Sequence, residues 1–217
     1  MITLYGTLRS RATRIVWTAE ELGIPYRREK VVFAGSLADP LAADAPLNTA
    51  SPAFLRVNPM GQLPAMVDDG LCMGESQAIC YYMARKAGGP LGPASLIEEG
   101  DILKWMFLAA TTVESAAGEI LYTYMDGKAD QPEGQTRIGA AITKLARPFG
   151  LMNTHLATTD WLVGGRFTVA DIALAEIVRY ATNAPGILDA YPSLKAWYER
   201  CQARPAFQRM WAMREAE

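Results

Sequence analysis

The sequence predicts an α/β unit of βαβ-ββα order followed by an all-α helical unit. Strand-like and helical patterns alternate in the first part of the chain, whereas only helical patterns follow residue 95. Between the two parts lies the segment Ala-Gly-Gly-Pro-Leu-Gly-Pro at 87–93, whose composition is typical of a linker. We therefore predict a first domain at 1–86, a linker at 87–95 and a helical domain at 96–217.

The first domain begins with a predicted βαβ unit. Strand-like segments at 2–5 and 26–33 flank a helix that Ser10 can cap and that Gly23 ends. This order favours a parallel pair of strands. The rest of the domain is predicted as a long loop at 35–52, a hairpin of strands at 65–67 and 71–73, and a helix at 76–86.

The second domain shows helical patterns alone, at 96–125, 132–156, 167–182, 193–203 and 205–214. Within it, Thr168 and Asp171 have the spacing of a capping box, with Asp in place of the usual Glu. Phe167 and Ile172 supply the hydrophobic staple that accompanies such a box. We interpret this motif as a stable helix start and not as a catalytic feature.

Charge and composition narrow the function classes. The 217 residues carry a net charge of −2, which gives no electrostatic basis for binding nucleic acid or an anionic membrane. No apolar run approaches the ~18 residues of a membrane span, and the first residues read as a strand, so we expect a cytoplasmic protein. Cys72, Cys80, Cys201 and the single His155 lack the spacing of a metal site, so no metal is expected.

The segment 57–83 carries the most chemical information. Pro64 stands directly before an apolar strand, although proline cannot donate to a strand ladder. Glu75 and Ser76 stand directly before a helical run, and a helix start of this kind faces anions. Together these features predict a hairpin that holds the backbone of a small peptide and a carboxylate of the same ligand.

The chain resembles the glutathione S-transferase superfamily over essentially its whole length. Besides the 57–83 segment, the resemblance rests on Phe-Thr-Val-Ala-Asp-Ile-Ala at 167–173, Tyr-Pro-Ser-Leu at 191–194 and Arg-Pro-Ala-Phe at 204–207. It implies a thioredoxin-like first domain in which Pro64 follows a cis peptide bond. It also implies a homodimer built by the first helices of the helical domain.

The resemblance implies that Ser10 activates the thiol of glutathione. The run 4–14 resembles the theta-like pattern, in which a serine follows the tyrosine of the first strand by five positions. A hydroxyl that donates to a thiolate contributes ~1.5–3 kcal/mol, which lowers a thiol pKa by roughly one to two units. Without the resemblance, Ser10 is simply a helix cap. Tyr5 and Thr7 are the competing hydroxyls, and Tyr5 is expected in the core.

The other parts of glutathione have implied partners as well. Ser76 would bind the γ-glutamyl carboxylate and Glu75 the ammonium group. The backbone of Leu63, next to Pro64, would pair with the cysteinyl unit as a short strand. Gln62 could reach the glycyl carboxylate.

The glycyl end is the exception to the family pattern. Many relatives bind it with a basic residue after the second strand, whereas no basic residue occurs here between Lys30 and Arg56. Gln62, Arg56 or the partner subunit would then hold that carboxylate. The long 35–52 loop occupies the same place in the sequence and could reshape or cover the site.

The resemblance also implies that the second substrate is a hydrophobic electrophile, bound between the domains. Candidate lining residues are Leu8, Arg9, Met106, Phe107 and Thr111, although such an apolar helical face is also typical of a core. Arg9 or Arg14 could add positive charge near the thiolate, or simply be solvated.

The resemblance therefore implies a glutathione S-transferase with glutathione as co-substrate and no resident cofactor. Two alternatives stay open. One is a glutathione-dependent disulfide reductase of the type that lacks its own redox cysteine, since cysteine-type relatives carry a thiol at the position of Ser10 and this chain does not. The other is a glutathione-binding or regulatory protein of the same fold without turnover.

Overall fold

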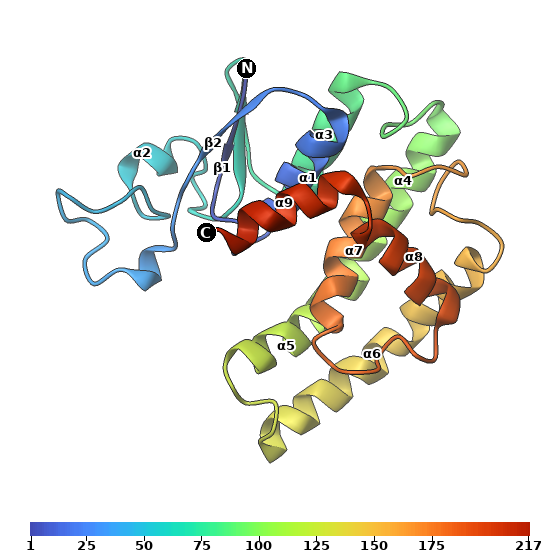
Figure 1. The fold of residues 1–217 in the computed structure, drawn as a ribbon. Helices are drawn as coiled ribbons and strands as arrows, with labels where there is room; N and C mark the ends of the chain where they lie inside the picture. Colours follow the sequence, from blue (N-terminus) through green and yellow to red (C-terminus); the bar gives the residue numbers. More distant parts are fainter. The chain divides into compact units, whose positions relative to one another are not determined.

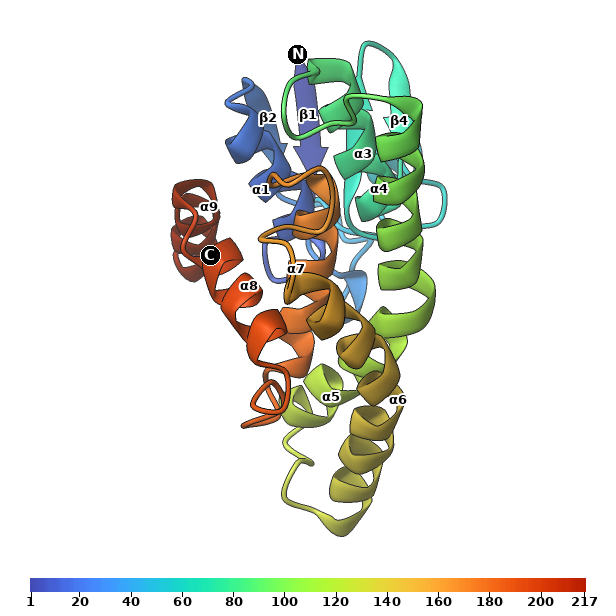
Figure 2. The same cartoon turned by 90° about the vertical axis from the view of Figure 1, so that its right-hand side faces the viewer.

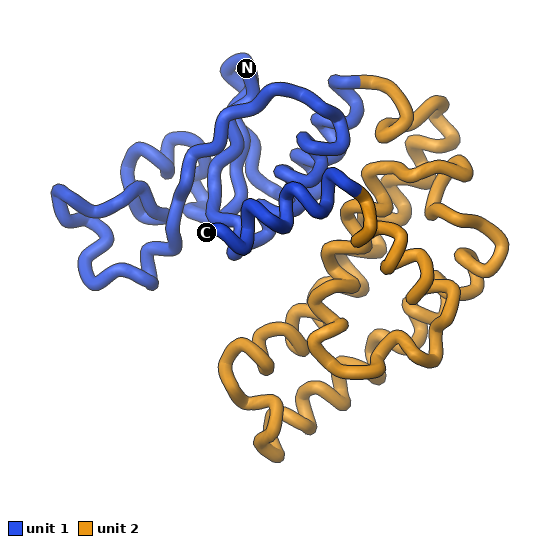
Figure 3. The backbone as a smooth tube through the Cα atoms, in the orientation of Figure 1, with its two compact units in different colours: residues 1–87, 205–217 blue, residues 88–204 orange.

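The chain divides into two units in the computed structural model, which describes residues 1–217 throughout (Figure 3). The first unit comprises Met1–Ala87 and Pro205–Glu217, and the second comprises Gly88–Arg204. The first unit contains β1 (Ile2–Tyr5), α1 (Ala12–Leu22), β2 (Tyr26–Glu29), η1 (Ala34–Ser36), α2 (Pro52–Leu55), β3 (Ala65–Asp68), β4 (Leu71–Met73), α3 (Ser76–Ala87) and α9 (Pro205–Glu215). The second contains α4 (Leu96–Leu108), η2 (Ala109–Val113), α5 (Glu114–Met125), α6 (Pro132–Leu156), α7 (Val169–Ala181) and α8 (Pro192–Gln202).

The first unit is built on a mixed four-stranded sheet with the order β2-β1-β3-β4. Strand β1 is parallel to β2 and antiparallel to β3, and β3 forms the expected hairpin with β4. Helices α1 and α3 lie side by side on one face of the sheet in Figure 1. The predicted βαβ-ββα order is therefore confirmed.

Helix α9 belongs by its contacts to the first unit. It packs along α1, where the Trp17 and Phe207 rings meet edge to face with their centroids 4.9 Å apart. Trp17 is fully buried and Phe207 is 3% exposed. The sequence predicts this helix in the second domain, 96–217, because it follows other helices. The structure places it in the first unit, because it covers an apolar face of α1.

Strand β2 is shorter than predicted, since it ends at Glu29 and not at residue 33. The apolar pattern continues, but Val32 pairs with the following loop instead of β1: its N–H donates to the Leu47 carbonyl at 3.0 Å. Buried Asn48 organises that loop, because its side-chain N–H groups donate to the carbonyls of Pro40 and Pro46. The predicted 35–52 loop, in which the sequence also allows one helical turn, thus holds the turn η1 and leads into the short helix α2.

In the second unit, α7 is the central helix and is buried along almost all of its length. It contacts α4, α5 and α8, and α6 packs against α5 and α8 (Figure 2). The single helix predicted at 96–125 is interrupted by the π-helical segment η2. The β-branched run Thr111-Thr112-Val113 disfavours regular helix, and the Thr111 hydroxyl donates to the Phe107 carbonyl at 2.8 Å.

The predicted capping box at Thr168 and Asp171 is confirmed. The Asp171 carboxylate accepts hydrogen bonds from the Thr168 N–H at 2.8 Å, the Trp197 indole N–H at 2.8 Å and the Leu162 N–H at 3.1 Å. One buried side chain thereby joins the start of α7 to α8 and to the preceding loop.

The segment predicted as a linker is held by Arg166. Its guanidinium pairs with both carboxylate oxygens of Glu98 and donates to the carbonyls of Pro90 and Gly92. These contacts fix the chain just before α4 within the second unit. No helix has both the length and the apolar character that crossing a membrane requires.

Candidate functional site

The loop after β1 lies next to Pro64. Tyr5 at the end of β1 is in register with Ala65 at the start of β3. The loop after β1 and the loop before β3 therefore lie at the same end of these two strands. Gly6 has a φ of +146°, and a Cβ on it would lie 3.1 Å from the Cβ of Ala12 and 3.8 Å from the Cα of Pro64. This close packing explains why a glycine follows the strand, and it brings the loop that contains Ser10 beside the predicted peptide-binding segment.

Ser10 precedes the first turn of α1. The helix begins at Ala12 with Arg11 in the N-cap position, so the prediction of Ser10 as the N-cap is corrected by one residue. Its Oγ donates to the Thr7 carbonyl at 2.6 Å and accepts from the Ala12 N–H at 3.1 Å. Ser10 is half-buried. Because the hydroxyl rotates freely about its C–O bond, the proton that it gives to Thr7 can be redirected to a bound acceptor.

The side chains of the two competing residues have other contacts. The Tyr5 ring packs on Phe54, with the centroids 6.3 Å apart, in the apolar cluster that also holds Val31 and Leu63. The Thr7 hydroxyl donates to the Glu217 carboxylate at 2.8 Å. Of the Thr7 and Ser10 hydroxyls, Ser10 is the one whose donor bond ends on a local main-chain carbonyl.

The predicted peptide-binding segment is shaped by Asn58. The Leu63–Pro64 peptide bond is cis. Asn58 is 7% exposed, and its side chain donates to the Gln62 carbonyl at 2.8 Å and accepts from the Met60 N–H at 3.2 Å. The Leu63 side chain is anchored in the apolar cluster, which fixes the main chain on either side of it.

Sequence reasoning missed Asn58. Its signal was the turn-forming Asn-Pro dipeptide followed by Gly61, which we read only as part of a longer motif. Asn58 also packs against the next part of the site, because a Cβ on Gly74 would lie 3.2 Å from its Nδ2. One buried amide therefore supports both the 58–63 turn and the residues just before Glu75.

Glu75 and Ser76 form the start of α3. Glu75 has a φ of +61°, a left-handed conformation that is costly for a residue other than glycine, and its carbonyl accepts the Ile79 N–H at 3.0 Å. Strained residues of this kind cluster at functional sites. Glu75 is exposed and Ser76 is 5% exposed, so the carboxylate faces solvent while the hydroxyl lies at the helix N-terminus.

Arg14 lies against Ser76. Its side chain is 1% exposed, and its Nη1 donates to the Ser76 Oγ at 3.1 Å. A buried guanidinium at this place adds positive charge to the helix N-terminus, which already favours anions. Of the two arginines that the sequence offered near the thiol, Arg9 is exposed, and Arg14 lies beneath the predicted carboxylate site.

The remaining predicted residues are dispersed. Gln62 and Arg56 are both exposed, near the predicted glycyl end of the ligand, and their role stays a prediction. Among the predicted electrophile contacts, Leu8 and Arg9 belong to the first unit, whereas Met106, Phe107 and Thr111 belong to the second. Leu8 and Met106 are buried, whereas Phe107 is 64% exposed. Not all of the predicted electrophile contacts are therefore on the surface.

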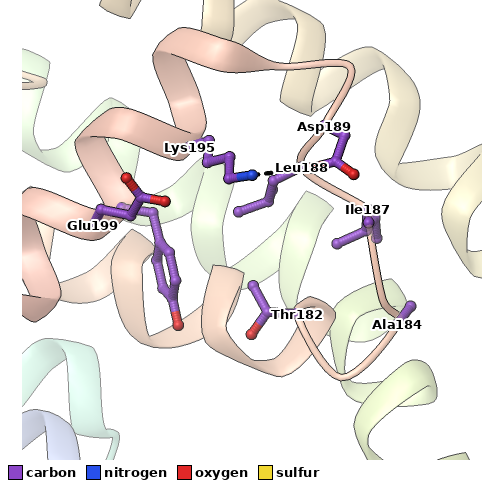
Figure 4. A pocket seen from close by; sticks show the side chains of 9 residues that line it. Thr182, Ala184, Ile187, Leu188, Asp189, Lys195 and Glu199 are labelled. Carbon is purple, nitrogen blue, oxygen red and sulfur yellow. Dashed lines mark hydrogen bonds and ion pairs between the residues drawn. The ribbon is translucent and has the colours of Figure 1, made fainter.

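One pocket lies in the second unit, and none of its lining residues is a predicted site residue (Figure 4). It has a volume of about 200 Å³ and lies between α8 and the chain that follows α7. Its cation, Lys195, is paired with Asp189 at 3.0 Å, so the pocket offers no unpaired lysine charge to a ligand. We assign no function to it.

Comparisons with known proteins place this arrangement in a family. Residues 10–86 match the glutathione S-transferase N-terminal domain, and residues 114–205 match the glutathione S-transferase C-terminal domain. Glutathione S-transferase GstB of Escherichia coli K12 is 30% identical over 214 residues, which cover 97% of each chain. Elongation factor 1-gamma 2 of Oryza sativa is 39% identical over 129 residues, which cover 59% of this chain and 30% of that protein.

Solved structures agree with the sequence matches. The theta class glutathione S-transferase of Xanthomonas axonopodis pv. citri, crystallised with glutathione bound, superimposes with a TM-score of 0.78 at 29% identity. That comparison covers 96% of this chain and 95% of the other. The two domain models and the full-length relatives agree with the two-part fold. This chain therefore belongs to the glutathione S-transferase family.

Proposed function

We propose that this protein transfers glutathione to a hydrophobic electrophile and that Ser10 stabilises the attacking thiolate, as in the serine-type, theta-like members of the family. The observation that carries the proposal is the convergence of three parts of the first unit. The Ser10 loop packs beside Pro64, and α1 is tied to the Ser76 turn through buried Arg14.

Glutathione would bind along these parts from one end to the other. The γ-glutamyl carboxylate would accept hydrogen bonds from the Ser76 hydroxyl and the N-terminus of α3, with the charge of Arg14 beneath. The exposed Glu75 carboxylate would accept from the ammonium group. The main chain of Leu63 would pair with the cysteinyl unit, which leaves the glycyl carboxylate near Gln62 and Arg56.

The chemistry then depends on the charge state of the sulfur. A free thiol has a pKa of ~8.5, so only a few per cent is thiolate near neutral pH. The Ser10 hydroxyl would turn from the Thr7 carbonyl to the sulfur and donate to it. One such bond contributes ~1.5–3 kcal/mol to the charged form. The thiol proton leaves to solvent, the thiolate forms a carbon–sulfur bond, and the electron pair of the broken bond departs with the leaving group.

A second candidate is a role without transfer chemistry. The partial match to a protein named as an elongation factor favours it, because that match shows similar sequence in a protein that is not named as a transferase. Calorimetric titration with glutathione and a conjugation assay with an activated aryl halide separate the two. Binding with turnover supports the transferase, and binding without turnover toward several electrophile classes supports the second candidate.

Ser10→Ala tests the residue assignment, and Ser36→Ala is its matched control. The Ser36 hydroxyl also donates to the carbonyl three residues earlier, that of Phe33 at 2.7 Å, but it lies on the exposed turn η1. We expect Ser10→Ala to lower kcat by about 10- to 100-fold with little change in glutathione affinity. Ser36→Ala should match the wild type. A fully active Ser10→Ala protein would contradict the assignment.

We also propose that the protein is a homodimer, as the resemblance implies. Sedimentation velocity over a range of protein concentrations measures this directly. A monomer at every concentration would contradict it.

A further inference from the structure

We propose that Glu217 is a positioning residue that holds the Thr7–Ser10 loop in the geometry needed for thiolate stabilisation. The inference rests on the proposed function of Ser10 and adds a part of the site that lies 210 residues away in sequence from Thr7. Both segments belong to the first unit.

The contact is made by the Glu217 side chain. Its Oε2 accepts from the Thr7 hydroxyl at 2.8 Å and from the Leu8 N–H at 2.6 Å. Its Oε1 accepts from Nη2 of Arg28, which projects from β2. One carboxylate, just beyond α9, thus contacts both the loop after β1 and the neighbouring strand β2. Figure 1 shows the C label near the end of β1 where that loop begins.

Burial makes this contact specific. The Glu217 side chain is 12% exposed and the Arg28 side chain is 26% exposed. Burial alone would raise the pKa of Glu217, but the bonds from Thr7 and Leu8 and the charge of Arg28 outweigh it and lower the pKa. The carboxylate is therefore ionised near neutral pH. Arg28 balances its charge, so the pair adds little net negative potential near a thiolate.

A short series of bonds links Glu217 to Ser10. Thr7 is fixed through its hydroxyl by Glu217, and the same hydroxyl oxygen accepts the Arg9 N–H at 3.2 Å. The Thr7 carbonyl in turn accepts the Ser10 hydroxyl at 2.6 Å. Residues 7–9 lie in no helix or strand, so the Glu217 contacts set the position of this stretch on the β1 side of Ser10. On the α1 side, the Ser10 carbonyl accepts from the Thr13 N–H at 3.4 Å and from the Thr13 hydroxyl at 3.3 Å. Without the carboxylate, the Leu8 N–H and the Thr7 hydroxyl lose their common acceptor.

The proposal predicts that loss of Glu217 affects kcat and the KM for glutathione differently. Glutathione affinity would depend chiefly on the segment around Leu63 and on Ser76, none of which Glu217 touches. The thiolate bond would depend on where Ser10 stands. Loosening the loop should therefore lower kcat and leave the KM for glutathione nearly unchanged.

The test compares Glu217→Ala, Glu217→Gln and the control Glu215→Ala by kinetics and by amide hydrogen exchange. Glu215 is exposed, and its carboxylate accepts from the Trp211 indole N–H of the same helix at 2.9 Å. For Glu217→Ala we expect kcat to fall about 10-fold, KM to stay within about 2-fold, and the Leu8 and Arg9 amides to exchange about 10-fold faster. Glu217→Gln keeps an acceptor oxygen but loses the charge that pairs with Arg28, so it should show part of both effects, and Glu215→Ala neither.

Unchanged amide exchange in Glu217→Ala would overturn the proposed contact, and faster exchange with unchanged kcat would overturn its role in positioning Ser10. A wild-type protein without conjugation activity would instead contradict the transferase proposal. The exchange measurement separates these failures, because it reports on the loop without requiring turnover.

Discussion

The Nη1 of Arg14 donates a 3.1 Å hydrogen bond to the Oγ of Ser76, which joins α1 to the first turn of α3. Both residues are at least 95% buried. Because Ser10 lies one turn before Arg14, the proposed thiol-activating and carboxylate-binding parts of the site share one buried polar contact. Arg14 therefore has both a structural and an electrostatic effect on the site.

Replacing Arg14 tests this link. We expect Arg14→Gln to weaken glutathione binding by about 10-fold, because the carboxylate loses a nearby charge and Ser76 loses a donor. Isothermal titration calorimetry measures the effect. Arg27→Gln is the control, since the Arg27 side chain is 66% exposed in its pair with Glu29. Equal affinities for wild type and Arg14→Gln would show that the buried charge does not act on the ligand.

Asn58→Ala should destabilise the first unit by ~1–3 kcal/mol, because the Gln62 carbonyl and the Met60 N–H lose their partner. Urea unfolding measures this loss, and glutathione binding should weaken with it because the Leu63 segment is no longer fixed. The matched control is Asn183→Ala in the second unit, whose amide donates to the Tyr180 carbonyl. It should lower stability without lowering affinity. Full glutathione affinity in Asn58→Ala would contradict the role given to this side chain.

Asp171→Ala should lower the free energy of unfolding by about 3 kcal/mol or more. The helix cap contributes ~1 kcal/mol, and the Trp197 and Leu162 N–H groups become unpaired inside the protein at ~1–3 kcal/mol each. Asp171→Asn keeps an acceptor oxygen and should lose less. Chemical denaturation checks both variants, and a loss below about 1 kcal/mol for Asp171→Ala would contradict the account of this cap.

The Glu98–Arg166 pair predicts a component of acid sensitivity. Hydrogen bonds from Arg166 lower the pKa of Glu98 to about 2 from its ordinary value of 4.5. A lowered folded-state pKa means that the contribution to stability is present above pH 4.5 and is lost as the pH falls toward 2. Unfolding measured across this range should therefore be less pH-dependent in Glu98→Gln than in the wild type. Glu133→Gln, which alters a pair whose Glu133 side chain is 70% exposed, should behave like the wild type.

Local patterns in the sequence were sufficient for most of the fold. The hairpin of β3 and β4, the helices α3 and α6 and the cap at Thr168 each follow from residues close together in the chain, so periodicity and turn chemistry reveal them. The end of β2 was wrong because an apolar strand pattern does not say which partner it pairs with. At Val32 the partner is the loop at Leu47 and not β1.

The contacts that organise the candidate site were less visible. Arg14 and Ser76 are 62 residues apart, and Thr7 and Glu217 are 210 apart, so no local spacing links either pair. Asn58 gave a turn signal but no indication of which carbonyl it would hold. The sequence and the resemblance thus supplied the residues proposed to touch glutathione, whereas the structure was needed to find the residues that position them.

The most direct test of the account is the ionisation of bound glutathione, followed through the ultraviolet absorbance of the thiolate as the pH is raised. With the wild type, we expect the thiol pKa of bound glutathione to lie roughly one to two units below the free value of ~8.5. With Ser10→Ala it should return close to the free value, and Ser36→Ala should titrate like the wild type. The same lowered thiol pKa in Ser10→Ala and in the wild type would contradict the central claim that Ser10 stabilises the thiolate.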